Sequence, residues 1–189
     1  ISDLFTPELR ARTLGGLCMA TIALITWWSC NAFIPVIASF LVNDLTVKLS
    51  PQEFLLMKSS FVKTGTLWFN LGGLIGTLLT MPFAVYFGRR PMFLVYFALS
   101  ALSIYVSFGM SIEPHTRLFI LFFNGLTVFG IFGSFTFYLP ELFPVHLRAT
   151  GAGFCYNTGR FLTAAGPFIV GGFAGSAASS ADILSVVSW

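Results

Sequence analysis

The segment PMFLVYFALSALSIYVSFGMSI, residues 91–112, contains no charged side chain and would be apolar on every face of a helix. Uncharged stretches also cover residues 13–43, 64–88 and 118–140, and a fifth covers residues 161–181. A helix needs about 20 mostly apolar residues to cross a bilayer, because about 30 Å of hydrocarbon must be spanned at about 1.5 Å per residue. Soluble domains of this size do not set four such stretches in series. The sequence therefore predicts an integral membrane protein.

The composition of the 189-residue chain supports this assignment. Its residues are 56% hydrophobic and only 9% charged, whereas soluble domains contain about 25% charged residues. In lipid, backbone polar groups must be satisfied internally, which leaves helices or closed barrels. Barrel strands alternate in polarity, and residues 91–112 do not, so we expect an all-α fold. The net charge of +3 is too small and too scattered to indicate nucleic-acid binding.

The pattern of reactive residues does not indicate an enzyme or a cofactor. The three cysteines, Cys18, Cys30 and Cys155, all lie in apolar stretches and lack the spacing of metal ligands. No Ser/His/Asp group, histidine cluster or pair of carboxylates is suggested by the sequence. We therefore expect no catalytic residue, metal, disulfide or cofactor.

The uncharged stretches predict five transmembrane helices and the start of a sixth. We interpret the chain as a fragment, because it begins without Met and because residues 182–189 open another apolar stretch. Residues 1–12 would form a cytoplasmic interfacial segment with a helix start at Thr6 and Pro7. Residues 13–189 would form a truncated six-helix bundle, and many transporters are built from two such halves.

The connections between these spans predict the orientation of the chain. A helix start is expected at Ser50 to Glu53, and tight connections are expected at residues 88–91 and 141–148. Basic residues near short loops favour the cytoplasm, so we assign to it the side that would hold Arg10, Arg12, Arg89, Arg90 and Arg148. The opposite side would hold Lys48, Lys58, Lys63 and Arg117.

The fifth span has two possible placements. Residues 161–181 are uncharged, but they are rich in Gly, Ala and Ser and end like a loop. A span over residues 149–172 leaves Arg148 at the cytoplasmic edge and places Arg160 about 16 Å into the membrane. We prefer this second placement. A charge at that depth usually faces a protein interior or an aqueous cavity, so Arg160 is the first candidate for contact with an anionic substrate. The alternative is an arginine that reaches an interface or pairs with another helix.

Other side chains within the predicted spans are weaker candidates for substrate contact. Tyr156 and Asn157 lie four and three residues before Arg160 and therefore share its helix face. Trp28 is expected in the outer half of the first span, as the wall of a binding site or as part of an interfacial aromatic belt. Three amides occupy separate spans, where such groups often join helices instead of binding a solute: Asn31, Asn70 and Asn124.

Small residues and prolines within the spans predict how the helices pack and bend. Gly72, Gly73 and Gly76 include a spacing of four residues that permits close helix approach. Pro35 in the first span and Pro167 in the fifth are expected to bend their helices.

Residues 141–151, ELFPVHLRATG, resemble the E-x-F-P-x-x-x-R-x-x-G segment of the sugar-porter and metabolite–proton symporter branches of the major facilitator superfamily. Residues 88–90, GRR, are similar to the end of that superfamily's G-x-L-x-D-R-x-G-R-R loop, although Val85 and Tyr86 replace its Asp and first Arg. Residues 4–10 resemble the start of the seventh helix. The resemblance implies half of a twelve-helix fold, with helices seven to eleven, the start of helix twelve and an amino-terminal six-helix half as partner.

The charged residues of these two connections form a second group of candidates. Glu141 and Arg148 are separated by one short turn and, with Arg89 and Arg90, would form a charge cluster on one face of the bundle. Such a network can hold helix ends together in one state and release them in another. The alternative is a set of ordinary positive-inside anchors.

The leading hypothesis is a secondary active transporter of a small organic solute, an organic anion or metabolite coupled to protons, in the plasma membrane. The solute and the lipid bilayer would be its partners, and the solute site would lie at the midplane between the two halves. Because no Asp or Glu lies within an apolar span, a coupling acid would come from elsewhere in the protein. A sugar facilitator or symporter and a transporter-like receptor or vesicle protein are the alternatives.

Overall fold

The computed structural model describes residues 1–43, 50–110, 112–165, 168 and 172, and these residues form helices and turns without a strand. The main helices are α1 (Arg10–Asn43), α2 (Pro51–Phe87), α3 (Arg89–Ile104), α4 (Pro114–Glu141) and α5 (Arg148–Thr163). Three short elements complete the described part: the 3-10 helices η1 (Ser2–Phe5) and η3 (Val145–Leu147), and the π-helical turn η2 (Tyr105–Gly109) that continues α3.

Four of these helices are long and apolar enough to cross a membrane, namely α1, α2, α3 with η2, and α4. The predicted all-α membrane fold is confirmed to that extent. The described part of α5 has 16 residues, fewer than a span needs. The count of five spans and a sixth stays a prediction, since the end of the fifth span, its Pro167 and residues 182–189 lie outside the described residues.

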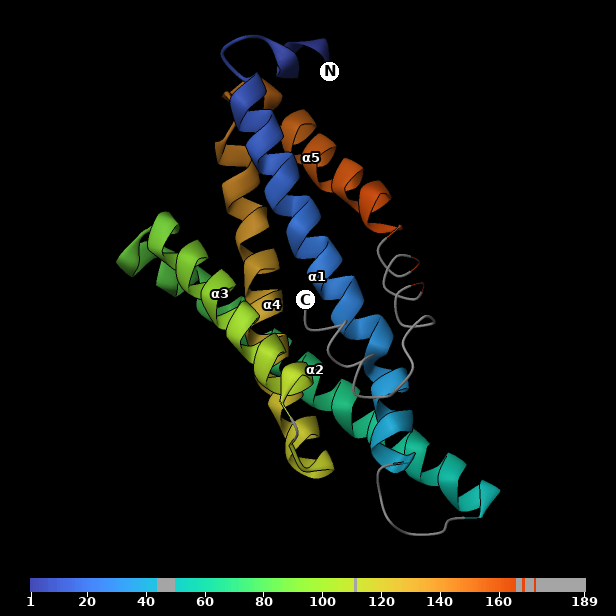
Figure 1. The fold of residues 1–189 in the computed structure, drawn as a ribbon. Coiled ribbons are helices and arrows are strands. Elements are labelled where there is room, and N and C mark those ends of the chain that lie inside the picture. The colour runs from blue at the N-terminus through green and yellow to red at the C-terminus, as the bar shows by residue number, and fades with distance from the viewer. Residues whose placement is uncertain (44–49, 111, 166–167, 169–171, 173–189) are drawn as a thin grey trace.

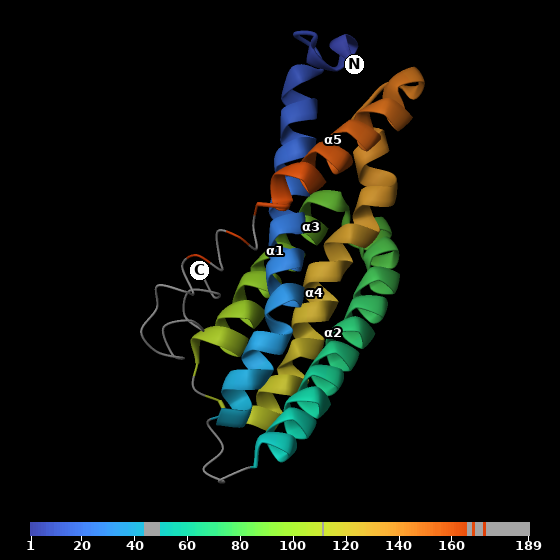
Figure 2. The ribbon, with the colours of Figure 1, turned by 90° about the vertical axis from the view of Figure 1, so that its right-hand side faces the viewer.

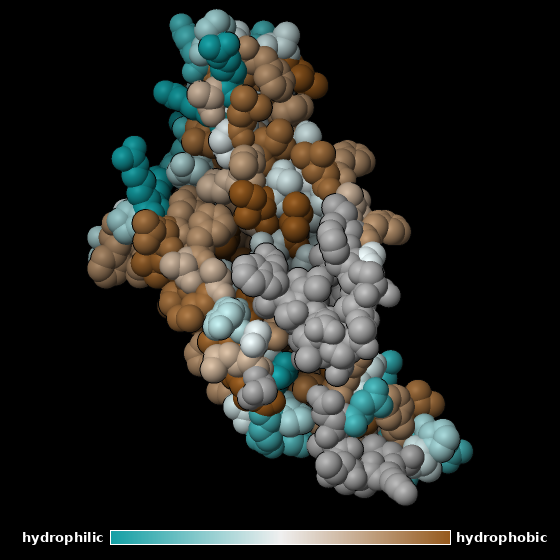
Figure 3. All heavy atoms as spheres, in the orientation of Figure 1, coloured by the Kyte–Doolittle hydropathy of each residue, from teal (hydrophilic) through white to brown (hydrophobic). Residues whose placement is uncertain are grey.

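The helices run between two polar ends. The chain start and the α4–α5 connection lie at the upper end, and the start of α2 and the α3–α4 turn lie at the lower end (Figures 1 and 2). On the face seen in Figure 3, hydrophilic side chains gather toward these ends, and hydrophobic side chains dominate between them. This distribution suits a bundle whose middle is surrounded by hydrocarbon.

Helix α2 is longer than the uncharged stretch predicts. Its start is fixed by a capping box, in which Ser50 Oγ accepts from the Glu53 N–H at 3.3 Å and the Ser50 N–H donates to Glu53 Oε2 at 2.9 Å. The predicted helix start is confirmed, but the helix then continues through Lys58 and Lys63 without a break. A helix of 37 residues measures about 55 Å at about 1.5 Å per residue, so its first turns extend beyond a hydrocarbon layer of about 30 Å.

The interfacial segment matches the expected helix start in its backbone. The Thr6 carbonyl accepts from the N–H groups of Leu9 and Arg10 at 3.0 and 2.9 Å, so a helical turn begins at Thr6 and Pro7. The Thr6 hydroxyl does not cap this turn but donates to the Asp3 carbonyl at 3.1 Å. The segment is attached to α1 by buried Thr13, whose Oγ1 donates to the carbonyl of buried Leu4 at 2.7 Å.

The backbones of α2 and α4 touch through glycines from both helices. A Cβ placed on Gly76 would lie 1.9 Å from the Leu126 carbonyl oxygen, and a Cβ on Gly125 would lie 1.8 Å from the Phe69 carbonyl oxygen. A Cβ on Gly72 would likewise lie 1.9 Å from a carbonyl oxygen of α4. Any side chain at these positions would force the helices apart. The predicted close helix approach is confirmed, and α4 is the partner helix.

A buried polar cluster links the same two helices to α3. Thr80 Oγ1 lies 2.7 Å from the Gly130 carbonyl oxygen of α4, and Tyr96 Oη of α3 donates to the Gly76 carbonyl at 3.1 Å. The Tyr96 ring fits against α4 because Gly130 lacks a Cβ, which would lie 2.0 Å from a ring carbon. Buried side-chain bonds of this kind hold helices together in lipid.

The α2–α4 contact predicts a large effect of one added methyl group. Gly125→Ala should destabilise the protein by about 1–3 kcal/mol or more, because the new Cβ overlaps a backbone oxygen that cannot rotate away. Gly153→Ala in α5 is the matched control, since a Cβ there meets nothing within 4 Å. The control should be neutral or slightly stabilising. Thermal unfolding of the full-length protein in detergent measures the stability of both variants. Equal unfolding midpoints for Gly125→Ala and Gly153→Ala would contradict the close packing of α2 on α4.

Candidate functional site

Helix α5 is positioned against α1 by small residues. A Cβ on Gly16 of α1 would lie 3.3 Å from Cys155 Sγ, and a Cβ on Gly159 of α5 would lie 3.2 Å from Leu24 Cδ1. This close approach brings the polar end of α5 beside the middle of α1. Arg160, which follows Gly159, is exposed, and its Cζ lies 6.0 Å from the centre of the Tyr156 ring.

A cavity of about 290 Å³ lies between α1, α4 and α5, and we name it the Arg160 pocket. Its lining consists of one cation, one aliphatic residue and five aromatic residues: Arg160, Leu24, Trp27, Trp28, Phe129, Phe132 and Tyr156. Three residues that the sequence singled out for substrate contact, Trp28, Tyr156 and Arg160, thus share one pocket. The phenylalanine walls were missed, because nothing in the sequence distinguishes two among 23 phenylalanines.

The aromatic walls of the Arg160 pocket support one another. The Trp27 ring packs edge-on against Trp28, Phe129 and Phe132, with ring centres 4.9, 5.7 and 6.2 Å apart. Such edge-to-face pairs are favoured at centre distances of about 4.5–7 Å. The walls are therefore held in place before any solute enters.

The pocket presents hydrogen-bond donors and little else that is polar. Trp27 Nε1 is buried, and no partner for it occurs among the described residues. Arg160 likewise forms no ion pair with a described carboxylate, since the ion pair found in this part of the chain joins Arg89 and Glu141. Tyr156 Oη is the one side-chain oxygen of the lining. A group with acceptor oxygens and negative charge would satisfy the guanidinium of Arg160.

The other amides singled out in the sequence do not line the Arg160 pocket. Asn157 and Asn70 are exposed, and each donates to a carbonyl one turn earlier in its own helix, at 2.9 and 2.8 Å. Asn31 is half-buried on α1. Asn124 is fully buried and donates from Nδ2 to Ser107 Oγ at 2.8 Å, which joins α4 to the π-helical turn after α3.

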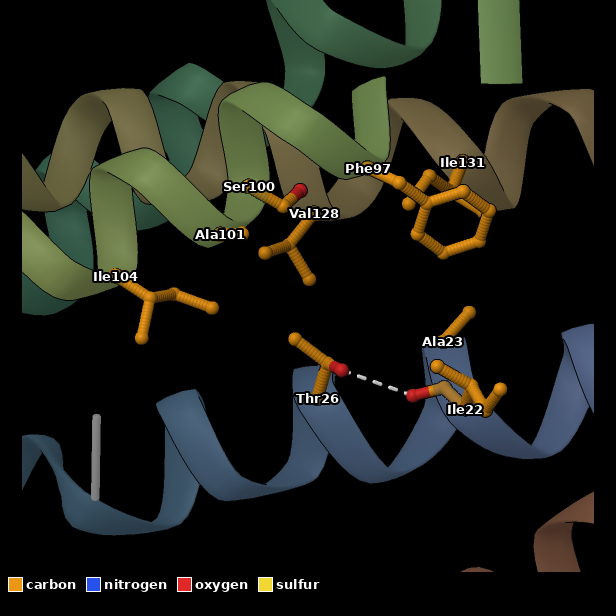
Figure 4. Close-up of a pocket in the computed structure, with 9 residues that line it drawn as sticks. All are labelled: Ile22, Ala23, Thr26, Phe97, Ser100, Ala101, Ile104, Val128 and Ile131. Atoms are coloured by element: carbon orange, nitrogen blue, oxygen red, sulfur yellow. Dashed lines mark hydrogen bonds between the residues drawn. The ribbon is translucent and has the colours of Figure 1, made fainter. Parts of the chain in front are cut away.

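A second cavity of about 280 Å³ lies between α1, α3 and α4. Figure 4 shows its α1 residues facing those of α3 and α4 across the gap. The Thr26 hydroxyl donates back to the Ile22 carbonyl at 2.9 Å, and the buried Ser100 hydroxyl has no partner among the described residues. No charged side chain lines this cavity. Of the two cavities, therefore, only the Arg160 pocket contains a cation that could bind an anionic solute.

The charged residues of the α2–α3 and α4–α5 connections form a smaller network than expected. Arg89 Nη2 donates to Glu141 Oε1, and this ion pair connects the α2–α3 turn to the end of α4. Arg148 instead donates from Nε to the Phe143 carbonyl at 3.4 Å, and Arg90 is exposed and forms no ion pair within the described residues. Of the four predicted members, the structure joins Arg89 and Glu141 directly.

Comparison with known proteins yields one informative similarity. The chain is 33% identical over 84 residues to a protein of Haemophilus influenzae named "Putative metabolite transport protein", and the match covers 44% of this chain. The chain spans only 20% of that relative's length. No family model and no solved structure matches the sequence. The four apolar helices and this similarity fit a membrane transport protein.

Proposed function

We propose that the chain is the carboxy-terminal half of a major facilitator superfamily transporter that moves a small organic anion across the plasma membrane, coupled to protons. The main support is the Arg160 pocket, where a cation without a described acidic partner lies against aromatic walls between three helices. The protein is not an enzyme in this proposal and needs no cofactor. Its partners are the solute, the bilayer and an amino-terminal six-helix half.

The physical basis for an anionic solute is the position of Arg160. A guanidinium binds a carboxylate or phosphate by charge-assisted hydrogen bonds, which are about twice as strong as neutral ones. Its planar fork permits two parallel bonds to one carboxylate, which a lysine cannot reproduce. Charged residues in spans commonly mark substrate paths for the same reason, because they are too costly to keep without a use.

Proton coupling requires an acid that this part of the chain does not place beside the pocket. No Asp or Glu lies between residues 64 and 112 or between residues 118 and 140, and the lining of the Arg160 pocket contains neither. In the proposal the amino-terminal half supplies the titrating carboxylate across the midplane cavity, where the two halves meet in such transporters.

Alternating access requires contacts that break in one of two states. The Arg89–Glu141 ion pair is suited to this, because both side chains are partly exposed, at 47% and 39%. Exposed pairs contribute only about 0–1 kcal/mol, so the pair biases a balanced equilibrium without locking it. In the proposal it favours the state in which the cytoplasmic helix ends are together.

The role of Arg160 is tested by uptake of labelled organic anions into vesicles that contain the full-length protein. Arg160→Ala should reduce uptake about 10- to 100-fold, since hydrogen bonds to charged groups contribute about 1.5–3 kcal/mol. Arg160→Lys should recover only part of the loss, because it keeps the charge without the fork. Arg90→Ala, which removes an exposed cation outside the pocket, is the control. Intact uptake by Arg160→Ala would make the residue structural and would end the proposal of an anionic solute.

The role of the ion pair is tested by comparing transport rate with equilibrium binding. Arg89→Gln and Glu141→Gln should each lower the rate about two- to fivefold, and the double variant should be no slower than either. Solute affinity should change less than the rate. Arg90→Gln is the matched control from the adjacent position and should transport normally. Normal rates in all variants would reduce these residues to topology anchors.

A further inference from the structure

The walls of the Arg160 pocket carry information about the solute beyond its charge. Five of the seven lining side chains are aromatic, and Trp27 is braced by edge contacts to three of the others. Phe129 is held in turn, because its ring lies over Gly73 of α2, where a Cβ would approach the ring to 2.6 Å. A rigid aromatic wall favours a flat ring, which gains ring–ring attraction as well as burial.

The volume of the pocket fits one ring with a short chain. A cavity of about 150 Å³ is sufficient for benzene, and the Arg160 pocket measures about 290 Å³. The remaining space accommodates a carboxylate and a link of two or three atoms.

The positive charge of Arg160 argues against one other class of solute that aromatic pockets commonly bind. Aromatic cages take quaternary ammonium groups, but Arg160 would repel them.

We infer that the solute is an aromatic monocarboxylate, whose carboxylate binds Arg160 and whose ring packs against the aromatic walls. This inference rests on the proposed transport function and narrows the solute of the same site.

Titration calorimetry on the purified full-length protein tests the inference with three probes. These are 3-phenylpropionate, 3-cyclohexylpropionate, which keeps the charge and removes the aromatic ring, and 3-phenylpropionamide, which keeps the ring and removes the charge. The phenyl acid should bind about tenfold tighter than the cyclohexyl acid, as a few edge or stacking contacts allow. The amide should bind more weakly than either acid.

Substitutions in α4 test whether the preference for the phenyl acid arises in the Arg160 pocket. Phe132→Leu keeps an apolar side chain in the pocket and should reduce the advantage of the phenyl acid. Phe123→Leu on the same helix is the matched control, since Phe123 is 47% exposed and lies outside this pocket; it should keep the advantage. If Phe132→Leu fails to accumulate, Trp28→Leu tests the same wall from α1, at a side chain that is 40% exposed.

The outcomes separate this inference from the proposed function. Equal affinity for the two acids, with the amide still excluded, would overturn the aromatic solute and leave anion transport intact. Amide binding as tight as acid binding would overturn the anion site itself and with it the proposed function. Binding of none of the probes, or a tenfold preference that Phe132→Leu leaves unchanged, would also overturn the aromatic monocarboxylate.

Discussion

The direct contact between the backbones of α2 and α4 determines where most other parts of the molecule lie. The contact is possible because Gly72, Gly76 and Gly125 have no Cβ, which at each position would overlap a carbonyl oxygen of the facing helix. Without an aqueous phase to drive apolar surfaces together, helices in lipid associate through such close packing and through buried hydrogen bonds. Once α4 is fixed on α2, its Phe129 ring lies over Gly73, and the wall of the Arg160 pocket is in place.

A second constraint acts on α5. Gly16 and Gly159 let α5 approach α1 closely enough for Arg160 to line the same pocket as the two tryptophans. Packing by small residues and the placement of a charge are thus linked. The glycines provide no chemistry, but they decide which side chains surround the cation.

The sequence predicted the helices well and the site in part. Uncharged stretches identify apolar helices because charge in lipid is costly, and Ser50 with Glu53 marked a true helix start. The extension of α2 through Lys58 and Lys63 was missed, since a helix outside hydrocarbon needs no apolar pattern. Arg160, Tyr156 and Trp28 were singled out by polarity and spacing, and the structure places all three in one pocket, whereas their contact with a solute stays a prediction. Phe129 and Phe132 were not singled out, because membership of a pocket depends on which helices become neighbours. Asn124 carried the same signal as a binding amide, although the structure bonds it to Ser107.

The central claim is that a solute reaches Arg160 from water, and cysteine accessibility tests it most directly. In full-length protein with exposed Cys18 replaced by alanine, Asn157→Cys places a thiol at an exposed position three residues before Arg160. A membrane-impermeant thiol reagent should label this cysteine, and 3-phenylpropionate should slow the labelling. A cysteine at exposed position 146, in the α4–α5 connection, should react at the same rate with or without the acid. A cysteine at position 157 that only lipid-soluble reagents label would place this face of α5 in hydrocarbon and contradict the account.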